Sequence, residues 1–417
     1  MTSQFLTRLS LFLVLSFVVV AAPVFSQGEC RWNEGHFPQG PVGDVRAMEV
    51  FDDGTGPALY VGGDFDHLAR WDGETWTELP LREETWGHFG VVKAMEVFDD
   101  GSGPALYIGG KFKEINGMTV NNIAKWDGAL WSALEGPEPG GAGVDSWVHT
   151  MATFDDGIDR FLAVGGEFIR AGGKRVWRVA RWDGERWLGL SGPKGSGCDA
   201  PLYSLAVVDF GNGAELLAGG WFVRAGGMRT FGVARWNGRR WNPVGTEERP
   251  GILGTARDLL AIEGGPLDGL YAIGGAFEPG PNEGPSEDPW EVFGFLRWDG
   301  SEWTPLSDQP GGWYTGFDGI LYRDGDGPSL YFIGDRMQDE DGSYYRLGRW
   351  NGMEWTPIRL RNTADHPGGV FNALCVFDDG SGPALYIGGN FTLILPDRPR
   401  GIVRLTCGPG KAMEAPE

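Results

Sequence analysis

The five histidines are the side chains in this sequence whose chemistry is most suggestive. They are His36, His67, His88, His149 and His366. The repeats described below predict strands that alternate in direction. With that alternation, all five histidines fall on one face of the fold or at its rim. Histidines from several loops could there bind a metal or act as acid and base. The candidate metal ligands are His36, His88 and His366. No H-x-x-H-type spacing accompanies them, however, and separate loops need not converge.

Catalytic motifs of the common hydrolase and nucleotide-binding classes are missing. The sequence has no G-x-S-x-G nucleophile elbow, no phosphate-binding loop, no Cys-x-x-Cys and no repeated Ser-x-Asp-x-Gly-x-Thr-Trp box. Asp-Asp-Gly-[Thr/Ser]-Gly segments recur, but Ca²⁺ needs about six to eight oxygen ligands and the spaced D-x-D-x-D-G pattern is lacking. We expect these aspartates to cap their own turns. The sequence therefore predicts no cofactor.

The histidines and aspartates belong to a repeat whose most regular part is a short apolar run followed by two glycines. Its clearest copies are PALYVGGDF at 57–65, PALYIGGKF at 104–112 and PALYIGGNF at 383–391. The run is too short for a helix and rich in strand-forming residues, which indicates a buried strand. Paired glycines let a neighbouring backbone come close or let the strand bulge. One such unit cannot bury its strand alone, so the units must stack.

Each repeat contains four predicted strands. In the second repeat, 92–98 is the first strand, the turn 99–103 leads into the glycine-pair strand, and the third strand ends at Trp126. Asp127-Gly128 is a hairpin signal, and the fourth strand carries Trp131. We expect the two tryptophans of this W-[DN]-G-x-x-W element to pack between repeats. Seven four-stranded units closing into a ring predict an all-β, seven-bladed β-propeller.

The glycine pair, the aromatic after it and the outer-strand tryptophan resemble the Kelch-type propeller. The fuller pattern LYIGGKFKEINGMTVNNIAKWDGALWSAL at 106–134 is similar to repeats of secreted bacterial glycine-rich propeller proteins and of fungal cortical bud-site marker proteins. The resemblance covers about residues 28–407 and implies the fold, but no particular activity, because propellers host many unrelated functions. The sixth repeat departs from the pattern, with Gly334-Asp335 in place of the glycine pair, and we expect an irregular strand there.

The N-terminal segment 1–26 has the features of a secretory signal peptide. Arg8 precedes the apolar run 9–22, and 24–26 is an acceptable cleavage site. An uncleaved N-terminal anchor is the alternative. We expect an exported protein, periplasmic, at the cell surface or extracellular, with the propeller at 27–410 and a short tail at 411–417.

The charge of the chain limits its partners. Its formal net charge is −22, which repels nucleic acid and anionic membranes. We expect a monomer that binds no nucleic acid and is not inserted in a membrane after signal cleavage.

Strand alternation places the short aspartate-rich turns on one face, the turn face, and the longer connections on the other, the loop face. Aromatic residues that break the repeat pattern lie in these longer connections and are binding candidates. They are Trp86, Trp290, Trp313 and Tyr314.

A second candidate site is formed by the second residue of every first strand, next to the central channel on the loop face. The seven residues are Arg46, Lys93, His149, Tyr203, Arg257, Asp318 and Asn372. This polar ring could hold an anionic or sugar-like ligand, although a solvated channel rim would have the same composition. We expect a non-enzymatic binding or scaffold propeller that recognises a protein or glycan through its loop face. A secreted hydrolase or oxidase using the histidines, or a structural surface or matrix component, remains open.

The last repeat ends without a fourth strand, and the segment 30–32 supplies one. When Trp32 is aligned with the fourth-strand tryptophans of the other repeats, Cys30 and Cys407 stand on either side of the chain break in the last hairpin. Residues so placed can reach the Cα separation that a disulfide needs. We expect this disulfide to seal the ring, and we expect Cys198 and Cys375 to stay unpaired.

Overall fold

The computed structural model describes residues 30–32, 43–81, 90–136, 140–192, 195–211, 213–275, 294–306, 315–338, 344–358, 369–392 and 400–407. Strands, turns and irregular segments make up all of these ranges, and no helix occurs in them. Accordingly, no helix in the described ranges is long and apolar enough to cross a membrane.

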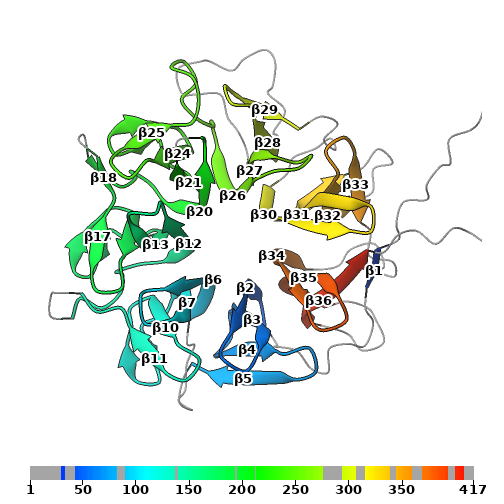
Figure 1. Cartoon of the computed structure of the whole chain (residues 1–417), viewed down its shortest axis with the longest axis horizontal. Coiled ribbons are helices and arrows are strands. Elements are labelled where there is room, and N and C mark those ends of the chain that lie inside the picture. The colour runs from blue at the N-terminus through cyan, green and yellow to red at the C-terminus, as the bar shows by residue number, and fades with distance from the viewer. Residues whose placement is uncertain are drawn as a thin grey trace, which may run out of the picture.

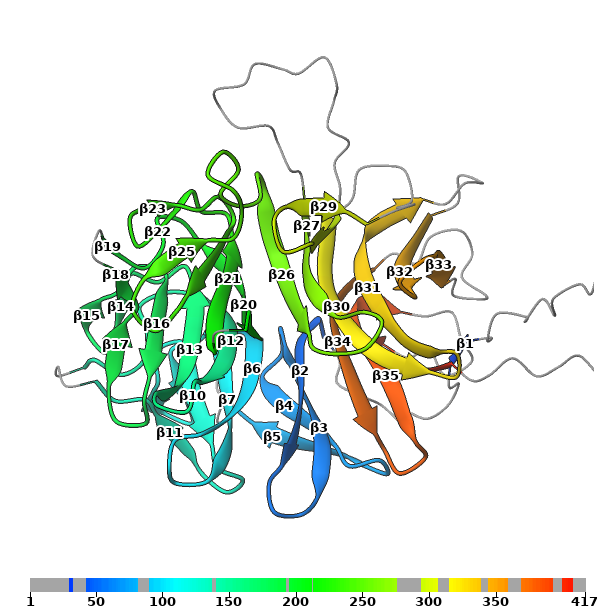
Figure 2. The same cartoon turned by 45° about the horizontal axis from the view of Figure 1, so that its top comes forward.

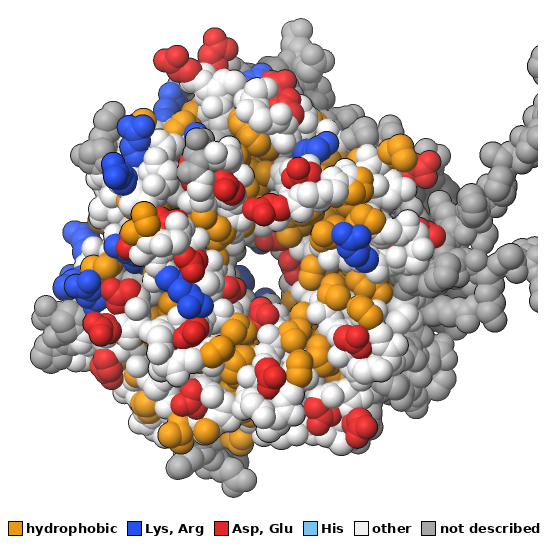
Figure 3. All heavy atoms as spheres, in the orientation of Figure 1, with side chains coloured by type: hydrophobic (Ala, Val, Ile, Leu, Met, Phe, Trp, Pro, Cys, Tyr) orange, Lys and Arg blue, Asp and Glu red, His pale blue; other side chains and the backbone are white. Residues whose placement is uncertain are grey.

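Seven four-stranded antiparallel blades stand around a central opening, as the sequence predicts (Figures 1 and 3), and blades 5 and 6 are joined by one pairing between Gly275 and Thr315. From the channel outward, blades 1 and 2 are β2 (Val45–Asp52), β3 (Pro57–Gly63), β4 (His67–Trp71), β5 (Trp76–Pro80), and β6 (Val91–Asp99), β7 (Pro104–Lys111), β10 (Ile123–Trp126), β11 (Trp131–Ala133). Blades 3 and 4, in the same direction, are β12 (Val148–Asp155), β13 (Arg160–Gly166), β16 (Val179–Trp182), β17 (Trp187–Gly189), and β20 (Leu202–Asp209), β21 (Ala214–Gly220), β24 (Val233–Trp236), β25 (Trp241–Pro243).

The remaining blades complete the ring. Blades 5 and 6 are β26 (Thr255–Ile262), β27 (Gly269–Gly275), β28 (Phe295–Trp298), β29 (Trp303–Pro305), and β30 (Thr315–Asp324), β31 (Gly327–Gln338), β32 (Tyr344–Trp350), β33 (Trp355–Ile358). Blade 7 is β34 (Val370–Asp378), β35 (Pro383–Thr392), β36 (Arg400–Cys407) and β1 (Cys30–Trp32). Short hairpins fold over the outer strands, namely β8 (Glu114–Ile115) with β9 (Met118–Thr119), β14 (Arg170–Ala171) with β15 (Lys174–Arg175), β18 (Ser191–Gly192) with β19 (Gly195–Ser196), and β22 (Arg224–Ala225) with β23 (Met228–Arg229).

The glycine pair serves both purposes that its position in a strand predicts. An added Cβ on Gly109 would lie 2.5 Å from Cγ1 of Val148, which belongs to the next blade. An added Cβ on Gly110 would collide with the carbonyl oxygen of Val91 in its own blade. The first glycine therefore admits the neighbouring blade, and the second admits the backbone of the inner strand.

Every inner strand has a β-bulge at its start on the loop face. The pairing skips one residue in each blade, for example between Val45 and Ala47 or between Val92 and Ala94. A bulged residue is left out of the ladder, and its side chain is re-aimed. The bulged residues are Arg46, Lys93, His149, Tyr203, Arg257, Phe317 and Asn372. We call these seven residues the mouth ring.

Blade 6 corrects one predicted member of this ring. Gly316 pairs with Gly334 and Asp318 pairs with Ile333, so the bulged residue is Phe317 and not the predicted Asp318. The prediction was wrong because Gly316 occupies the buried position that Val45 holds in blade 1, and a glycine hides the apolar pattern that marks the start of the strand. The expected irregularity of this blade is confirmed, since the β31–β32 pairing shifts between Ile333 and Met337.

The N-terminal strand closes the ring in the predicted register. β1 lies beside β36 (Figure 1), with Trp32 opposite Leu405 and Cys30 opposite Cys407. Blade 7 thereby gains its fourth strand, and the outer edge of β36 is covered. The two other cysteines, Cys198 and Cys375, are buried and unpaired, as expected.

The aspartates in the turns between the first and second strands of a blade form hydrogen bonds within the chain. In blade 1, Asp52 Oδ1 accepts hydrogen bonds from the N–H groups of Gly54 at 2.9 Å and Gly56 at 3.0 Å. Asp53 accepts one from the Tyr60 hydroxyl at 2.9 Å and pairs with Arg70 at 3.1 Å. The capping role predicted for these aspartates is confirmed.

Tryptophans of the outer strands join neighbouring blades where they are buried. Trp187 and Trp241 are each 1% exposed. Their indole N–H groups donate to the preceding blade, to Leu134 O at 3.1 Å and to Leu190 O at 3.0 Å. Packing between blades is therefore confirmed at these positions.

Candidate functional site

The mouth ring is a chain of side-chain contacts around the channel opening on the loop face. On one side, the Arg257 guanidinium lies 5.6 Å from the ring centroid of Phe317 and 5.9 Å from that of Tyr203. The Tyr203 ring is in turn 5.3 Å from the His149 ring. Blades 3 to 6 thus contribute an aromatic wall that supports one cation.

On the opposite side of the ring, Arg46 and Asn372 both contact the carboxylate of Asp44. Arg46 pairs with Asp44 at 2.5 Å, and the Asn372 amide donates to the same carboxylate at 2.6 Å. Burial raises the pKa of Asp44 and the nearby Asp64 adds to the rise, whereas Arg46 opposes it. No sequence signal pointed to Asp44, because it precedes the strand and belongs to no repeated motif.

His149 is placed as a neutral side chain. Its Nε2 lies 3.1 Å from Oε1 of Glu167. Burial, followed by the charge of Lys93, lowers its pKa to about 4, although Glu167 acts in the opposite direction. At neutral pH the imidazole is therefore uncharged, and it serves as a hydrogen-bonding wall rather than as a cation.

Lys93 is the cation of the mouth ring whose pKa is shifted from its ordinary value. Burial, followed by the charges of Arg46 and Arg257, lowers its pKa to about 8, against an opposing effect of Glu167. Among the described residues, neither Lys93 nor Arg257 makes an ion pair. The mouth thus combines a half-buried lysine and an exposed arginine, both without a counter-ion in the described ranges, with a neutral aromatic wall.

Asp318 serves a different purpose from the one predicted. Its Oδ2 accepts a hydrogen bond from Leu374 N in blade 7 at 2.7 Å. Asp258 makes the same contact one blade earlier, to Gly319 N at 3.2 Å, and burial raises the pKa of both carboxyls. These side chains satisfy backbone N–H groups on the channel edge of the next blade, which would otherwise lack partners.

The remaining predicted site residues fall largely outside the described part of the chain. His67 lies on β4 with Nε2 3.8 Å from Glu78. Within the described ranges, no group of three or more His, Cys, Asp or Glu side chains is placed to hold a metal. The predicted residues outside the described ranges are Trp86, Trp290, Trp313, Tyr314, His36, His88 and His366.

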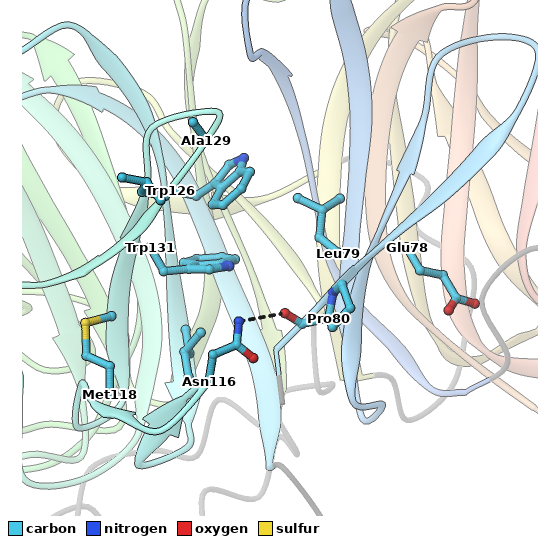
Figure 4. Close-up of a pocket in the computed structure, with 10 residues that line it drawn as sticks. Glu78, Leu79, Pro80, Asn116, Met118, Trp126, Ala129 and Trp131 are labelled. Atoms are coloured by element: carbon cyan, nitrogen blue, oxygen red, sulfur yellow. Dashed lines mark hydrogen bonds between the residues drawn. The ribbon is translucent and has the colours of Figure 1, made fainter. Parts of the chain in front are cut away.

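A separate groove of about 530 Å³ opens on the outer flank between blades 1 and 2. Figure 4 shows Trp126, Trp131 and Asn116 on one side, facing Leu79 and Pro80 on the other. The Asn116 amide donates to Pro80 O at 3.4 Å. Half-buried indoles beside an amide make this groove a second place where a small ligand could bind.

Two sequence features open this groove. In blade 3 an added Cβ on Gly172 would lie 2.7 Å from Cδ1 of Trp187, so the indole packs directly on the glycine. Asn116 takes that position in blade 2, with a φ of 48°, and its side chain occupies the space. In addition, β5 has five residues where β11 has three, and Leu81 is buried in blade 1. Leu81 O accepts a hydrogen bond from Asn116 N at 3.2 Å, so blades 1 and 2 stay joined beside the groove.

No family model and no curated protein sequence matches the chain. Among solved structures, YCF48 bound to D1 peptide is 14% identical, with 95% of this chain and 99% of that chain covered and a TM-score of 0.49. Chaetomium thermophilum Raptor is 12% identical over 92% of this chain and 30% of that chain, with a TM-score of 0.43. A protein named as an oxidoreductase (glucose dehydrogenase) from Thermus thermophilus is 16% identical over 90% of this chain and 100% of that chain, with a TM-score of 0.39.

Likenesses this distant do not inform on what the chain binds. The seven-bladed propeller itself is observed directly in the strand pairing. The closer kinship with Kelch-type, secreted bacterial and bud-site marker propellers stays a sequence-based prediction.

Proposed function

We propose that this protein is a non-enzymatic binding propeller that recognises an acidic group of a glycan or protein at the loop-face mouth of its channel. The observation that carries the proposal is the pair Lys93 and Arg257, which have no ion-pair partner among the described residues. In a chain of net charge −22, cations gathered at one opening form a local site for an anion.

The electrostatics of Lys93 support an anionic ligand. Its pKa is lowered because burial and two neighbouring guanidinium groups disfavour its charge. A bound carboxylate or sulfate would offset both effects and would raise that pKa. The Tyr203 and Phe317 rings beside Arg257 add an apolar wall for the body of the ligand.

We further propose that the protein acts as a monomer after export, as the segment 1–26 and the acidic charge indicate. The alternative of a hydrolase or oxidase has weaker support in the described residues. The pKa of His149 is lowered to about 4 and its Nε2 already contacts Glu167, so this imidazole is a weak base for taking a proton from a substrate at neutral pH.

The test is a glycan array of uronate-, sialate- and sulfate-bearing chains beside matched neutral chains, followed by titration calorimetry of the best binder. We expect acidic chains to be selected. Lys93→Met should weaken binding about tenfold or more, in line with the loss of a charge-assisted contact. Affinity should also fall as the pH rises through about 8, where Lys93 loses its proton.

Arg239→Met is the matched control, because Arg239 is an exposed cation of the β24–β25 turn on the opposite face. It should leave the affinity within about twofold of the wild type, the range expected for a remote surface charge. Equal binding of neutral and acidic chains, or a Lys93→Met affinity equal to that of the control, would contradict the proposal.

A further inference from the structure

Two hairpins of the same design lie next to each other on the outer flank of the ring. They are β14–β15 in blade 3 and β22–β23 in blade 4, at the outer edge of Figure 2. Their sequences, IRAGGKRVW at 169–177 and VRAGGMRTF at 223–231, match in the spacing of two arginines and of the aromatic that follows, and Met228 stands where the first hairpin has Lys174. Both hairpins turn through Gly-Gly with positive φ.

The cations of these hairpins have no counter-ions in the described part of the chain. Arg170, Lys174, Arg175, Arg224 and Arg229 are all exposed, and none of them makes an ion pair within the described residues. Nη1 of Arg170 and Nη1 of Arg224 donate to carbonyls of their own hairpins, at 2.9 and 3.3 Å.

The carboxylates at the base of the two hairpins are already in use. Asp145 Oδ1 accepts from the backbone N–H groups of Ile169 and Arg170, at 2.8 and 3.0 Å. Asp199 Oδ1 does the same one blade later, accepting from Val223 and Arg224 at 3.0 Å each. Each aspartate therefore shapes the base of a hairpin and forms no ion pair with the cations at its tip.

An aromatic ring lies under one cation of each hairpin. The Arg175 guanidinium is 4.4 Å from the Trp177 ring centroid, and that of Arg229 is 5.0 Å from the Phe231 ring centroid. Trp177 and Phe231 have φ values of 59° and 40°, in the left-handed region that bulky residues rarely adopt. The fold thus presents the same pair, a cation over a ring, twice.

The hairpin β18–β19 joins the two into one surface. Ser196 Oγ donates to Val176 O at 3.2 Å, and Cys198 N donates to Trp177 O at 3.1 Å. On its other side, an added Cβ on Gly195 would lie 3.4 Å from the backbone nitrogen of Gly227. The connecting segment 191–196 contains no acidic residue. We call the combined surface of β14–β15, β18–β19 and β22–β23 the flank strip.

The fold does not require these cations. Blade 2 carries the same hairpin, β8–β9, with Glu114, Met118 and Thr119 where blade 3 has Arg170, Lys174 and Arg175. Asn121 stands in the place of Trp177 and also has a positive φ, of 48°. Blade 2 therefore lacks the positive charge that this hairpin carries in blades 3 and 4, where Figure 3 shows lysine and arginine side chains gathered along the outer edge.

We propose that the flank strip binds an extended acidic polysaccharide with uronate or sulfate groups. Cations repeated in adjacent blades fit charges repeated along a polymer, and the five cations of the two hairpins are all exposed. Arginine fits carboxylate and sulfate in a planar, bidentate way. Among polyanions, a polysaccharide fits better than nucleic acid, because duplex DNA carries about one charge per 1.7 Å and a chain of net charge −22 repels it strongly.

The test measures binding of the mature full-length protein to immobilised polygalacturonate and to a sulfated polysaccharide, with dextran, oligo-dT and polyglutamate as comparison probes. We expect binding to the acidic polysaccharides that weakens as salt is raised. The double variant Arg175→Ala/Arg229→Ala should lose about tenfold or more in affinity, because each arginine supplies a charge-assisted contact.

The control variant Arg239→Ala/Arg240→Ala removes the same charge from the turn face of blade 4 and should retain wild-type affinity. A second variant, Arg170→Glu/Lys174→Met/Arg175→Thr, gives blade 3 the residues that blade 2 already folds with, so its melting temperature should be unchanged while binding is lost. All of these variants are compared in a Lys93→Met background, so that binding of acidic chains at the channel mouth contributes little to the measured affinity and the two proposed sites are tested separately. Three results would overturn the proposal. The control could lose as much affinity as the double variant, oligo-dT or polyglutamate could bind more tightly than the acidic polysaccharides, or neither acidic polysaccharide could bind.

Discussion

The fourth-strand tryptophan packs differently in different blades. Trp187 is buried and donates its indole N–H to the preceding blade. Trp131 occupies the equivalent position in blade 2, yet it is half-buried and lines the groove beside Asn116. The difference comes from the neighbouring residue, since Asn116 carries a side chain at the position where Gly172 lets the Trp187 indole pack directly on the backbone.

This contrast predicts unequal costs of truncation. Trp187→Ala should lower the free energy of unfolding by about 3–5 kcal/mol, as large-to-small changes of buried aromatics do. Trp131→Ala should cost less, about 1–2 kcal/mol, because part of the indole is already in water. Denaturant unfolding of both variants measures the difference. Equal costs would mean that the groove is closed in solution.

Glu49 predicts a pH dependence of stability. Burial, followed by the charge of Glu96, raises its pKa to about 8. Because the folded state holds this proton more tightly than the unfolded state, the contribution to stability is full below about pH 4.5 and is lost as the pH rises through about 8.

Glu49→Gln should remove this dependence and stabilise the protein above pH 8, by on the order of 2–4 kcal/mol, since one pKa unit corresponds to about 1.4 kcal/mol. Chemical unfolding at about pH 5 and about pH 9, on either side of the titration, measures the effect. The wild type and the variant should differ at the higher pH far more than at the lower. A constant difference between them would contradict the assigned pKa.

At the level of elements, the glycine-pair strand decides how closely the blades approach. Gly109 faces Val148 of the next blade, and no side chain fits between them. The inner strands need further support, because in the described sheets six of the seven have no partner strand at the channel edge, and β30 pairs with β27 only between Thr315 and Gly275. Asp258 and Asp318 provide it by accepting N–H groups of the following blade.

Gly109→Ala should therefore destabilise the fold by about 1–3 kcal/mol, the usual cost of overpacking. Gly192→Ala is a suitable control, because an added Cβ there meets its nearest atom at 3.6 Å. It should change the free energy of unfolding by less than about 0.5 kcal/mol, as expected where there is room. Thermal or denaturant unfolding distinguishes the two, and a neutral Gly109→Ala would show that the blade spacing is adaptable.

For the molecule as a whole, closure through β1 is the decisive feature. The register places Cys30 opposite Cys407, and directly opposed residues of antiparallel strands have Cα atoms about 4.5–5.5 Å apart. This separation lies within the range of about 4.4–6.8 Å found for disulfides. The predicted disulfide would join the two ends of the propeller.

Non-reducing peptide mapping should therefore show Cys30 linked to Cys407, with thiols remaining at Cys198 and Cys375. On the loop-entropy model, reduction should cost roughly 4–5 kcal/mol of stability. Cys30→Ser/Cys407→Ser should be as unstable as the reduced wild type and should not respond to reductant. Titration of all the cysteines as free thiols in the oxidised, unfolded protein would refute the pairing.

The sequence by itself determined the repeat, the blade count and the closing strand. Each of these depends on local patterns, namely the glycine pair, the Trp-Asp-Gly turn and the period of two along a strand, and such patterns hold wherever one face is buried. Even the Trp32–Leu405 register follows from counting residues against the other blades.

The tertiary structure alone decided which side chains meet. Phe317 rather than Asp318 occupies the mouth ring because the bulge depends on how β30 pairs with β31. The cations of 170–175 and 224–229 are plain in the sequence, but only the stacking of blades places both hairpins on one flank, with no acidic partner among the described residues. Contacts between blades join residues about fifty positions apart, as in the Trp187–Leu134 bond, and no local pattern along the chain specifies them.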